Sequence, residues 1–255
     1  MSLKLISINV ERSKHLDRVL PFLKAEGADV VCVQELMERD IPAFEEATGA
    51  RCIYSPGMRH DREGEKGIEG IAMFSRFQVR SHVERFYLGS ADDIRIYDFS
   101  SAEAKRSSQN FKVLLCEVES GGVVFKIATT HFTWTPDGLP TDYQREDLET
   151  MLRILQNEGD FVLCGDFNAP RGGEIFSKIA ETYTDNIPSH YEWSIDTDLH
   201  RAGDGQIQQN AKKAGLPGFM VDGLFTTRRY RATNVELRSG VSDHMAVVAD
   251  IDRVQ

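Results

Sequence analysis

The sequence predicts an α/β fold in a single domain, and three observations support this. Short apolar runs suited to buried strands recur along the chain. Several segments between them carry the apolar spacing of amphipathic helices. A length of 255 residues is common for one α/β domain and allows a large core. Because no internal repeat or low-complexity tract interrupts the pattern, we expect residues 1–255 to form one domain.

The strands are expected where apolar residues follow one another directly, as in sheets buried on both faces. Mixed with helical segments, such runs predict a mixed α/β arrangement. In chain order the runs are LKLISINV (3–10), DVVCVQE (29–35), GIAMFS (70–75), FKVLLCEVE (111–119), VVFKIATTHF (123–132), FVLCGDF (161–167), FMVDGLFTT (219–227) and MAVVADI (245–251).

A first helix is expected between the first two strands, on the apolar face formed by Leu16, Val19, Leu20 and Leu23. Gly27 is placed to end it, and Pro21 indicates either a bend or a late start.

The clearest helix begins near Thr141, which has capping-box spacing with Gln144. Gly159 follows as a stop signal. Its apolar stripe consists of Leu148, Met151, Leu152 and Leu155.

Two long segments have little apolar content to hold them in place. They are SPGMRHDREGEKG (55–67) and HRAGDGQIQQNAKKAGLPG (200–218). Both are expected to form exposed loops, which in α/β proteins can face a substrate or be simple insertions.

The charge and the cysteines limit the function classes. A net charge of −10 argues against holding long nucleic acid on a broad basic surface, although a local basic groove at a phosphate site remains compatible with it. Cys32, Cys52, Cys116 and Cys164 are widely spaced and lack a CxxC pattern, which indicates reduced thiols rather than disulfides or zinc ligands.

The N-terminal stretch MSLKLISINVE lacks the pattern of a signal peptide, and no run of about eighteen apolar residues suggests a membrane span. With the reduced thiols, these features predict a cytoplasmic protein, which we expect to be a monomer.

Carboxylate and amide side chains stand where strands leave the core. Glu35 ends DVVCVQE, while Asp166 and Asn168 end FVLCGDFNAP. Ligand sites in α/β sheets gather at such strand ends. Polar residues also interrupt buried-strand patterns, where burial is costly without partners, and this predicts one shared network. The interrupting residues are Asn9, His131 and Asp222, and the stretch SGVSDHMAVVAD adds Asp243 and His244.

Each of these residues also has a purely structural interpretation. Glu35 would then be a solvated strand end, His131 a core histidine with satisfied hydrogen bonds, and the SDH tripeptide a turn before a strand. The joint pattern is much harder to explain in this way.

The sequence resembles the endonuclease/exonuclease/phosphatase superfamily of metal-dependent phosphoesterases. The motifs that carry the resemblance are, in chain order, SINVE, VQE, EGIAMFSR, TTHF, GDFN, VDGLF and SDH. The resemblance extends over nearly the whole chain. It implies a four-layer αββα sandwich, in which two mixed sheets pack face to face with helices outside. It also implies a single site at one end of that sandwich.

The resemblance implies a metal centre. Glu35 would be the principal ligand of a divalent cation, with Asn9 and Asp243 close to the metal or its waters. A shell of oxygen ligands suits Mg²⁺ or Mn²⁺ rather than zinc.

The resemblance also implies roles around the phosphate. Asp166 would orient or deprotonate the attacking water, and Asn168 would hold a phosphate oxygen or that water. His244 would contact the phosphoryl group, with Asp222 hydrogen-bonded to its other ring nitrogen.

The deoxyribonuclease-like branch of this superfamily has a second histidine at its active site. By that resemblance His131 would lie near the leaving group, and Glu69 would orient its ring. Gly223 departs from the pattern, because many relatives carry a bulky residue after this aspartate.

Together these expectations describe a phosphodiesterase that uses in-line attack of water, with nuclease-like activity on DNA or RNA as the leading hypothesis. Basic residues in three loop clusters could supply a local phosphate-tracking rim: Arg59, His60, Arg62 and Lys66; Lys105 and Arg106; and RRYR (228–231). The alternatives are a phosphomonoesterase, a phospholipid-headgroup or small-molecule phosphodiesterase, and a catalytically silent binding protein of the same fold.

Overall fold

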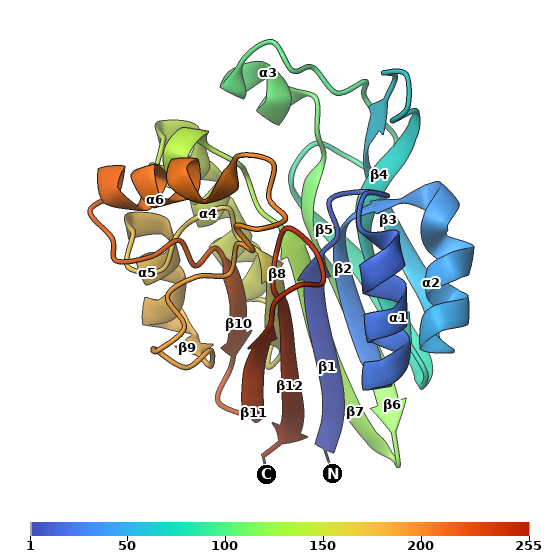
Figure 1. Cartoon of the computed structure of the whole chain (residues 1–255). Helices are drawn as coiled ribbons and strands as arrows, with labels where there is room; N and C mark the ends of the chain where they lie inside the picture. The colour runs from blue at the N-terminus through green and yellow to red at the C-terminus, as the bar shows by residue number, and fades with distance from the viewer. Residues whose placement is uncertain (1, 255) are drawn as a thin grey trace.

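Two six-stranded sheets pack face to face with helices on their outer sides in the computed structural model, which describes residues 2–254 (Figure 1). The expected four-layer αββα sandwich is therefore confirmed. The first sheet has the order β11 (Tyr230–Arg238), β12 (Ala246–Arg253), β1 (Ser2–Asn9), β2 (Val30–Met37), β4 (Gly67–Ser75) and β3 (Arg51–His60).

The second sheet has the order β5 (Gln78–Leu88), β6 (Phe111–Ser120), β7 (Val123–His131), β8 (Val162–Asp166), β10 (Asp222–Thr226) and β9 (Thr184–Asp185). The helices are α1 (Leu16–Glu26), α2 (Ile41–Thr48), α3 (Ala102–Ser107), α4 (Asp142–Leu155), α5 (Glu174–Thr182) and α6 (Gly203–Lys213), with short 3-10 turns η1 (Glu38–Asp40) and η2 (Pro136–Gly138).

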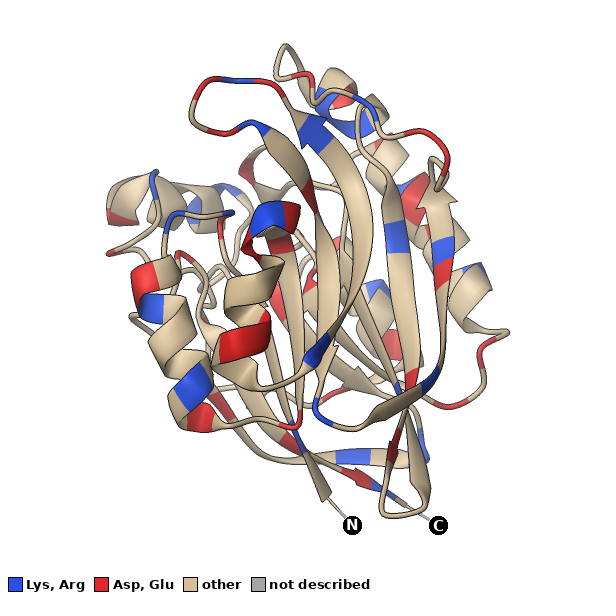
Figure 2. Ribbon diagram, turned by 90° about the vertical axis from the view of Figure 1, so that its right-hand side faces the viewer, with Lys and Arg blue, Asp and Glu red and all other residues tan. Residues whose placement is uncertain are grey.

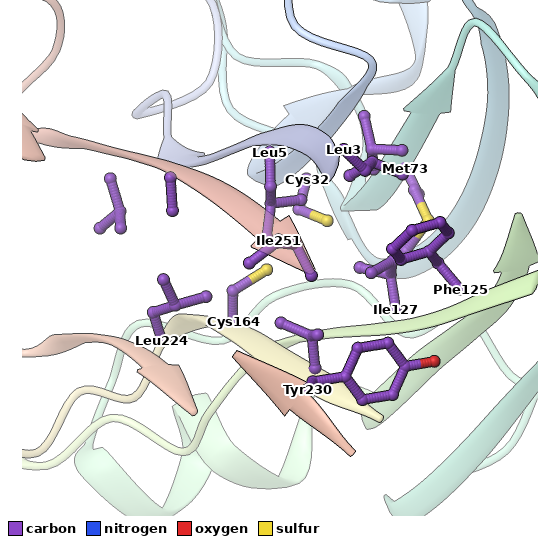
Figure 3. Close-up of a cluster of buried hydrophobic side chains, with 14 of the residues drawn as sticks. Leu3, Leu5, Cys32, Met73, Phe125, Ile127, Cys164, Leu224, Tyr230 and Ile251 are labelled. Atoms are coloured by element: carbon purple, nitrogen blue, oxygen red, sulfur yellow. The ribbon is translucent and has the colours of Figure 1, made fainter. Parts of the chain in front are cut away.

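Alternation along each strand divides the core into layers. In β1, Leu3 and Leu5 enter the core between the sheets, while Ile6 and Ile8 enter the core beneath α1 and α2. The second sheet is covered in the same way by α4 and α5. Figure 3 shows the core between the sheets, where side chains from both sheets meet. Burial of each large apolar side chain contributes about 1.5–3 kcal/mol.

Each sheet contains one parallel pair, and these pairs position the site. β1 runs parallel to β2 with Asn9 opposite Gln34, and β7 runs parallel to β8 with His131 opposite Asp166. Strand β10 is antiparallel to β8 and begins with Asp222 opposite Asp166. The carboxyl ends of the parallel strands and the start of β10 therefore bring these polar residues to one end of the sandwich.

Helix boundaries follow the capping signals closely. The Thr141 hydroxyl accepts a hydrogen bond from the Gln144 backbone N–H at 3.3 Å, as the capping-box spacing predicts. Gly27 ends α1 in the left-handed conformation. The late start suggested by Pro21 was wrong, because α1 begins at Leu16 and continues through the proline.

The two segments expected to be loops are partly regular. Residues 55–60 extend the edge strand β3 along β4, and only the following turn is loop. Residues 203–213 form α6, whose Ile207 and Ala211 pack with Phe219 and Val221. Two apolar residues spaced by four are enough for a helix that docks on an apolar surface, but too few to predict it.

The cysteine expectation is confirmed as far as the thiols are concerned. Cys32, Cys116 and Cys164 are buried and free, and Cys52 is half-buried and free. Across residues 2–254, none of the helices has the length and apolar character needed to cross a membrane.

Candidate active site

The backbone is left-handed at two of the expected site residues. Glu35 has a φ of 56° at a register shift between β2 and β4, and Asn168 has a φ of 49° just after β8. Left-handed backbone is unfavourable for glutamate, and bulges of this kind re-aim a side chain. Strain at positions that carry the polar residues is typical of functional sites.

One amide connects the two sheets at this end. The Asn9 side chain donates to Oε1 of Glu35 at 3.2 Å and to Oδ2 of Asp166 at 3.0 Å. Its own carbonyl oxygen accepts from the Glu11 backbone N–H at 3.0 Å, which fixes the orientation of the amide. Asn9 and Asp166 are each only 1% exposed, so these contacts are shielded from water.

The imidazole rings of His131 and His244 both approach Oδ2 of Asp166. Nε2 of His131 lies 3.5 Å from Oδ2 of Asp166, and Nε2 of His244 lies 3.8 Å from it. Nδ1 of His244 is 2.8 Å from Oδ2 of Asp222, as the resemblance implied. Burial lowers the pKa of His244, but the nearby Asp222 and Asp166 carboxylates raise it more, and the net pKa is well above its usual value.

Asp243 completes the acidic side of the site. It is 5% exposed and accepts a hydrogen bond from the Ser242 hydroxyl at 3.2 Å. Burial, assisted by repulsion from Glu35, raises the pKa of Asp243 to about 7, although His244 opposes the shift. Buried carboxylates crowded in this way are stabilised by a cation, and an oxygen-rich set of this kind fits Mg²⁺ or Mn²⁺.

Glu69 has a different partner from the expected one. Its Oε2 lies 2.8 Å from Nε2 of His60, and among residues 2–254 no hydrogen bond joins it to His131. The strand register accounts for this partner: His60 on β3 pairs opposite Gly67 on the neighbouring strand β4, which brings its ring to the buried Glu69. Burial, followed by repulsion from Glu35, raises the pKa of Glu69.

Arg12 was not predicted as a site residue, but it lies beside the expected metal ligand. Its guanidinium is 3.2 Å from Oε2 of Glu35 and 3.8 Å from Oε2 of Glu69. Its place in the turn directly after the strand that carries Asn9 was the available signal. Arg12 neutralises part of the charge of two neighbouring carboxylates, and it lines the cavity over this centre together with Glu35.

A cavity of about 360 Å³ opens over this centre. Asp166, Asn168, Asp243 and His244 line it together with residues that sequence reasoning missed, among them Trp134, His200, Arg201 and Gln206. The last three lie in the segment taken for a loop, which has no apolar periodicity to indicate that it folds back over the site. Burial, with repulsion from His244, lowers the pKa of His200 to about 4, so this ring is neutral.

The expected basic rim is not assembled. His60 is buried against Glu69, and Arg106 is bonded to Asp147 at 2.7 and 2.8 Å. The residues 228–231 follow β10, whose first residue is at the site, so they lie at the opposite end of the sandwich. Figure 2 shows basic and acidic residues interspersed over helices and loops in that view.

Comparison with known proteins agrees with this geometry. The sequence model described as Endonuclease/Exonuclease/phosphatase family matches residues 6–244. A search of curated proteins finds no match.

Several solved structures share the fold. An endonuclease/exonuclease/phosphatase from Bacteroides vulgatus has a TM-score of 0.70 and 15% identity, with 99% of each chain covered. The human Nocturnin catalytic domain with bound sulfate has a TM-score of 0.69 and 17% identity, covering 99% of this chain and 94% of that one. A mannosyl-6-phosphatase from Bacteroides thetaiotaomicron has a TM-score of 0.66 and 12% identity, covering 99% and 100%.

Proposed function

Because the chain belongs to the endonuclease/exonuclease/phosphatase family, we propose that it hydrolyses a phosphate ester with a divalent cation, Mg²⁺ or Mn²⁺. The observation that carries the proposal is the convergence of two histidines and one amide on Oδ2 of the buried Asp166. A carboxylate faced by several donors, at the base of a cavity, is suited to hold a water against an anionic ester.

The cation would be held by Glu35, with Asn9 and Asp243 close to it. When bound, it supplies positive charge for the phosphate oxygens and lowers the pKa of a neighbouring water. The residues fit this role because the carboxylates of Glu35 and Asp243 line the same cavity. Among residues 2–254, the cationic or potentially cationic groups within ion-pair distance of Glu35 are Arg12 and His131.

Asp166 directs the attacking water. Its Oδ1 accepts the Asn168 backbone N–H at 2.8 Å, which leaves Oδ2 for the Asn9 amide and the reacting water. The Asn168 amide donates to the Phe132 carbonyl oxygen at 2.9 Å and retains one N–H for a phosphate oxygen. In this proposal the water attacks phosphorus in line with the leaving group.

The two histidines stabilise the phosphoryl group and the leaving group. His244, made basic and oriented by Asp222, offers Nε2 as a charged donor to a phosphate oxygen. His131 ends β7 opposite Asp166 of β8. In this proposal its ring donates a proton to the departing oxygen. Glu69 is hydrogen-bonded to His60, and both Glu69 and His131 line a small neighbouring cavity.

A second candidate is nuclease-like action on DNA or RNA, which the pair of histidines around Asp166 favours. The net charge of −10 argues against a long polymeric substrate, and so does the fact that the expected basic rim is not assembled. Hydrolysis of a smaller ester is compatible with the cavity, and one protein of this fold is named a mannosyl-6-phosphatase.

The test is a panel of phosphomonoesters, small phosphodiesters, DNA and RNA, each with Mg²⁺, Mn²⁺ or chelator. We expect hydrolysis of at least one ester that chelator abolishes and that Asp166→Asn reduces strongly. The Asn variant keeps the size of the side chain, and calorimetric cation binding checks that the centre remains formed. The proposal is wrong if a folded, cation-binding protein hydrolyses none of these esters.

A further inference from the structure

The cavity continues past the catalytic residues to an exposed tryptophan. Trp134 lines the same cavity as Asp166 and His244, and 38% of its surface is exposed, which is unusual for a large aromatic residue. Nζ of Lys105, from α3, lies 4.2 Å from the centre of the indole ring. Arg201, from the segment before α6, lines the cavity as well.

Arg201 lines the cavity, and Lys105 lies over the indole ring of Trp134, which also lines it. Neither cation forms an ion pair with any residue between 2 and 254, unlike the neighbouring Arg106, which pairs with Asp147. Burial, followed by repulsion from Arg201, lowers the pKa of Lys105. In an acidic protein, two uncompensated cations at a cavity mouth attract an anion.

One buried carboxylate positions the two segments that carry this region. Asp147 accepts two hydrogen bonds from Arg106, which follows Lys105 in α3. It also accepts from the Thr133 hydroxyl at 2.7 Å, and Thr133 directly precedes Trp134. With its side chain 2% exposed, Asp147 holds α3 and the Trp134 segment together, so Lys105 and the indole ring are a constructed pair rather than a chance surface contact.

Residues of η2 and α6 line the other side of the cavity. Nζ of Lys213 in α6 lies 2.8 Å from Oδ2 of Asp137 in η2, which ties the helix to the turn. Beneath this tie, Ile207 packs in an apolar cluster with Phe219 and Val221, which also line the cavity. The cavity volume of about 360 Å³ suits a compact group of small-molecule size rather than a nucleic acid duplex.

We propose that the substrate is a compact phosphate ester with a second anionic group, which binds between Lys105 and Arg201 while the body of the molecule packs against Trp134. The inference rests on the proposed function, because it assigns the scissile phosphate to the site at Asp166. The second group is a phosphate or a carboxylate, since both match lysine and arginine donors.

The test uses two matched ligand pairs in the presence of chelator, so that no turnover occurs. Fructose 1,6-bisphosphate against fructose 6-phosphate probes a second phosphate, and 3-phosphoglycerate against glycerol 3-phosphate probes a carboxylate. Calorimetry gives the dissociation constant of each. In at least one pair, we expect the wild type to bind the ligand with two anionic groups about tenfold more tightly than its partner.

Lys105→Gln and Arg201→Gln should each remove most of that preference while affecting the ligand with one anionic group little. Arg228→Gln is the matched control, because it removes the same charge from an exposed position at the far end of the sandwich. Thermal melting of every variant checks folding.

The inference is wrong if the wild type shows no preference in either pair, or if any preference survives in both cavity variants. A failure of the proposed function appears separately, as an absence of cation-dependent hydrolysis in the substrate panel, because the binding measurement requires neither metal nor turnover. Preference in one pair alone identifies the second group as phosphate or carboxylate.

Discussion

The pairing of Asp222 with His244 makes a quantitative prediction about catalysis. The two side chains are joined at 2.8 Å, and the residues are only 3% and 7% exposed, so solvent screens their interaction little. A hydrogen bond to a charged group contributes about 1.5–3 kcal/mol. Asp222→Asn, which keeps the shape but removes the charge, should therefore lower kcat by about 10- to 150-fold.

His244→Ala removes the donor itself, and loss of one such donor to a developing negative charge costs about 100- to 1000-fold in kcat. Because Asp222 acts through His244, the double variant should be no slower than His244→Ala. The coupling energy of the cycle should then equal the whole effect of Asp222→Asn, about 1.5–3 kcal/mol.

The assay is kcat at saturating cation and substrate, using the ester that the wild type hydrolyses fastest. Cation binding and thermal melting confirm that each variant is folded, and His82→Ala serves as a control at an exposed histidine on β5. Two results would refute the reasoning: losses that multiply in the double variant, or near-normal activity of a folded, cation-binding His244→Ala protein.

Three other predictions follow from the same description. Glu35→Gln should abolish cation-dependent activity and weaken calorimetric Mg²⁺ binding while leaving the melting temperature without metal nearly unchanged; a large loss of stability would instead make Glu35 structural. Asp166→Asn should lower kcat far more than it raises KM, and equal effects on both would contradict its role in directing the water. Burial lowers the pKa of Lys112 from 10.5 to about 8. Because the unfolded chain then binds more protons between these values, the free energy of unfolding of the wild type relative to Lys112→Met should rise by about 3 kcal/mol from pH 7 to pH 11 in denaturant titrations. Parallel pH profiles for the two proteins would exclude this penalty.

Much of the fold and part of the site could be predicted because the relevant signals are local. A strand buried on both faces needs consecutive apolar residues, and a polar residue at its end is visible without knowledge of its partner. Asn9 and Asp166 are such cases, and the structure brings both to the same contact. The link between Asp222 and His244 was implied by resemblance and has the expected partners.

The remaining features depend on tertiary contacts. Glu69 bonds His60 because of the register between β3 and β4, which the sequence does not encode in any local pattern. Helix α6 depends on an apolar surface formed by Phe219 and Val221, since its own apolar face has only two residues. The cavity wall that it builds was therefore invisible at the sequence level.

The Asn9 amide contacts Glu35 of one sheet and Asp166 of the other. We therefore expect activity to depend on the alignment of the two sheets. Catalytic geometry tolerates errors of about 0.5 Å, so a slight slide of one sheet over the other would silence the enzyme while both sheets stayed folded. The packing around Cys32 and Cys164, in the core between the sheets, contributes to that alignment (Figure 3). Core residues between the sheets are thus under functional as well as structural constraint.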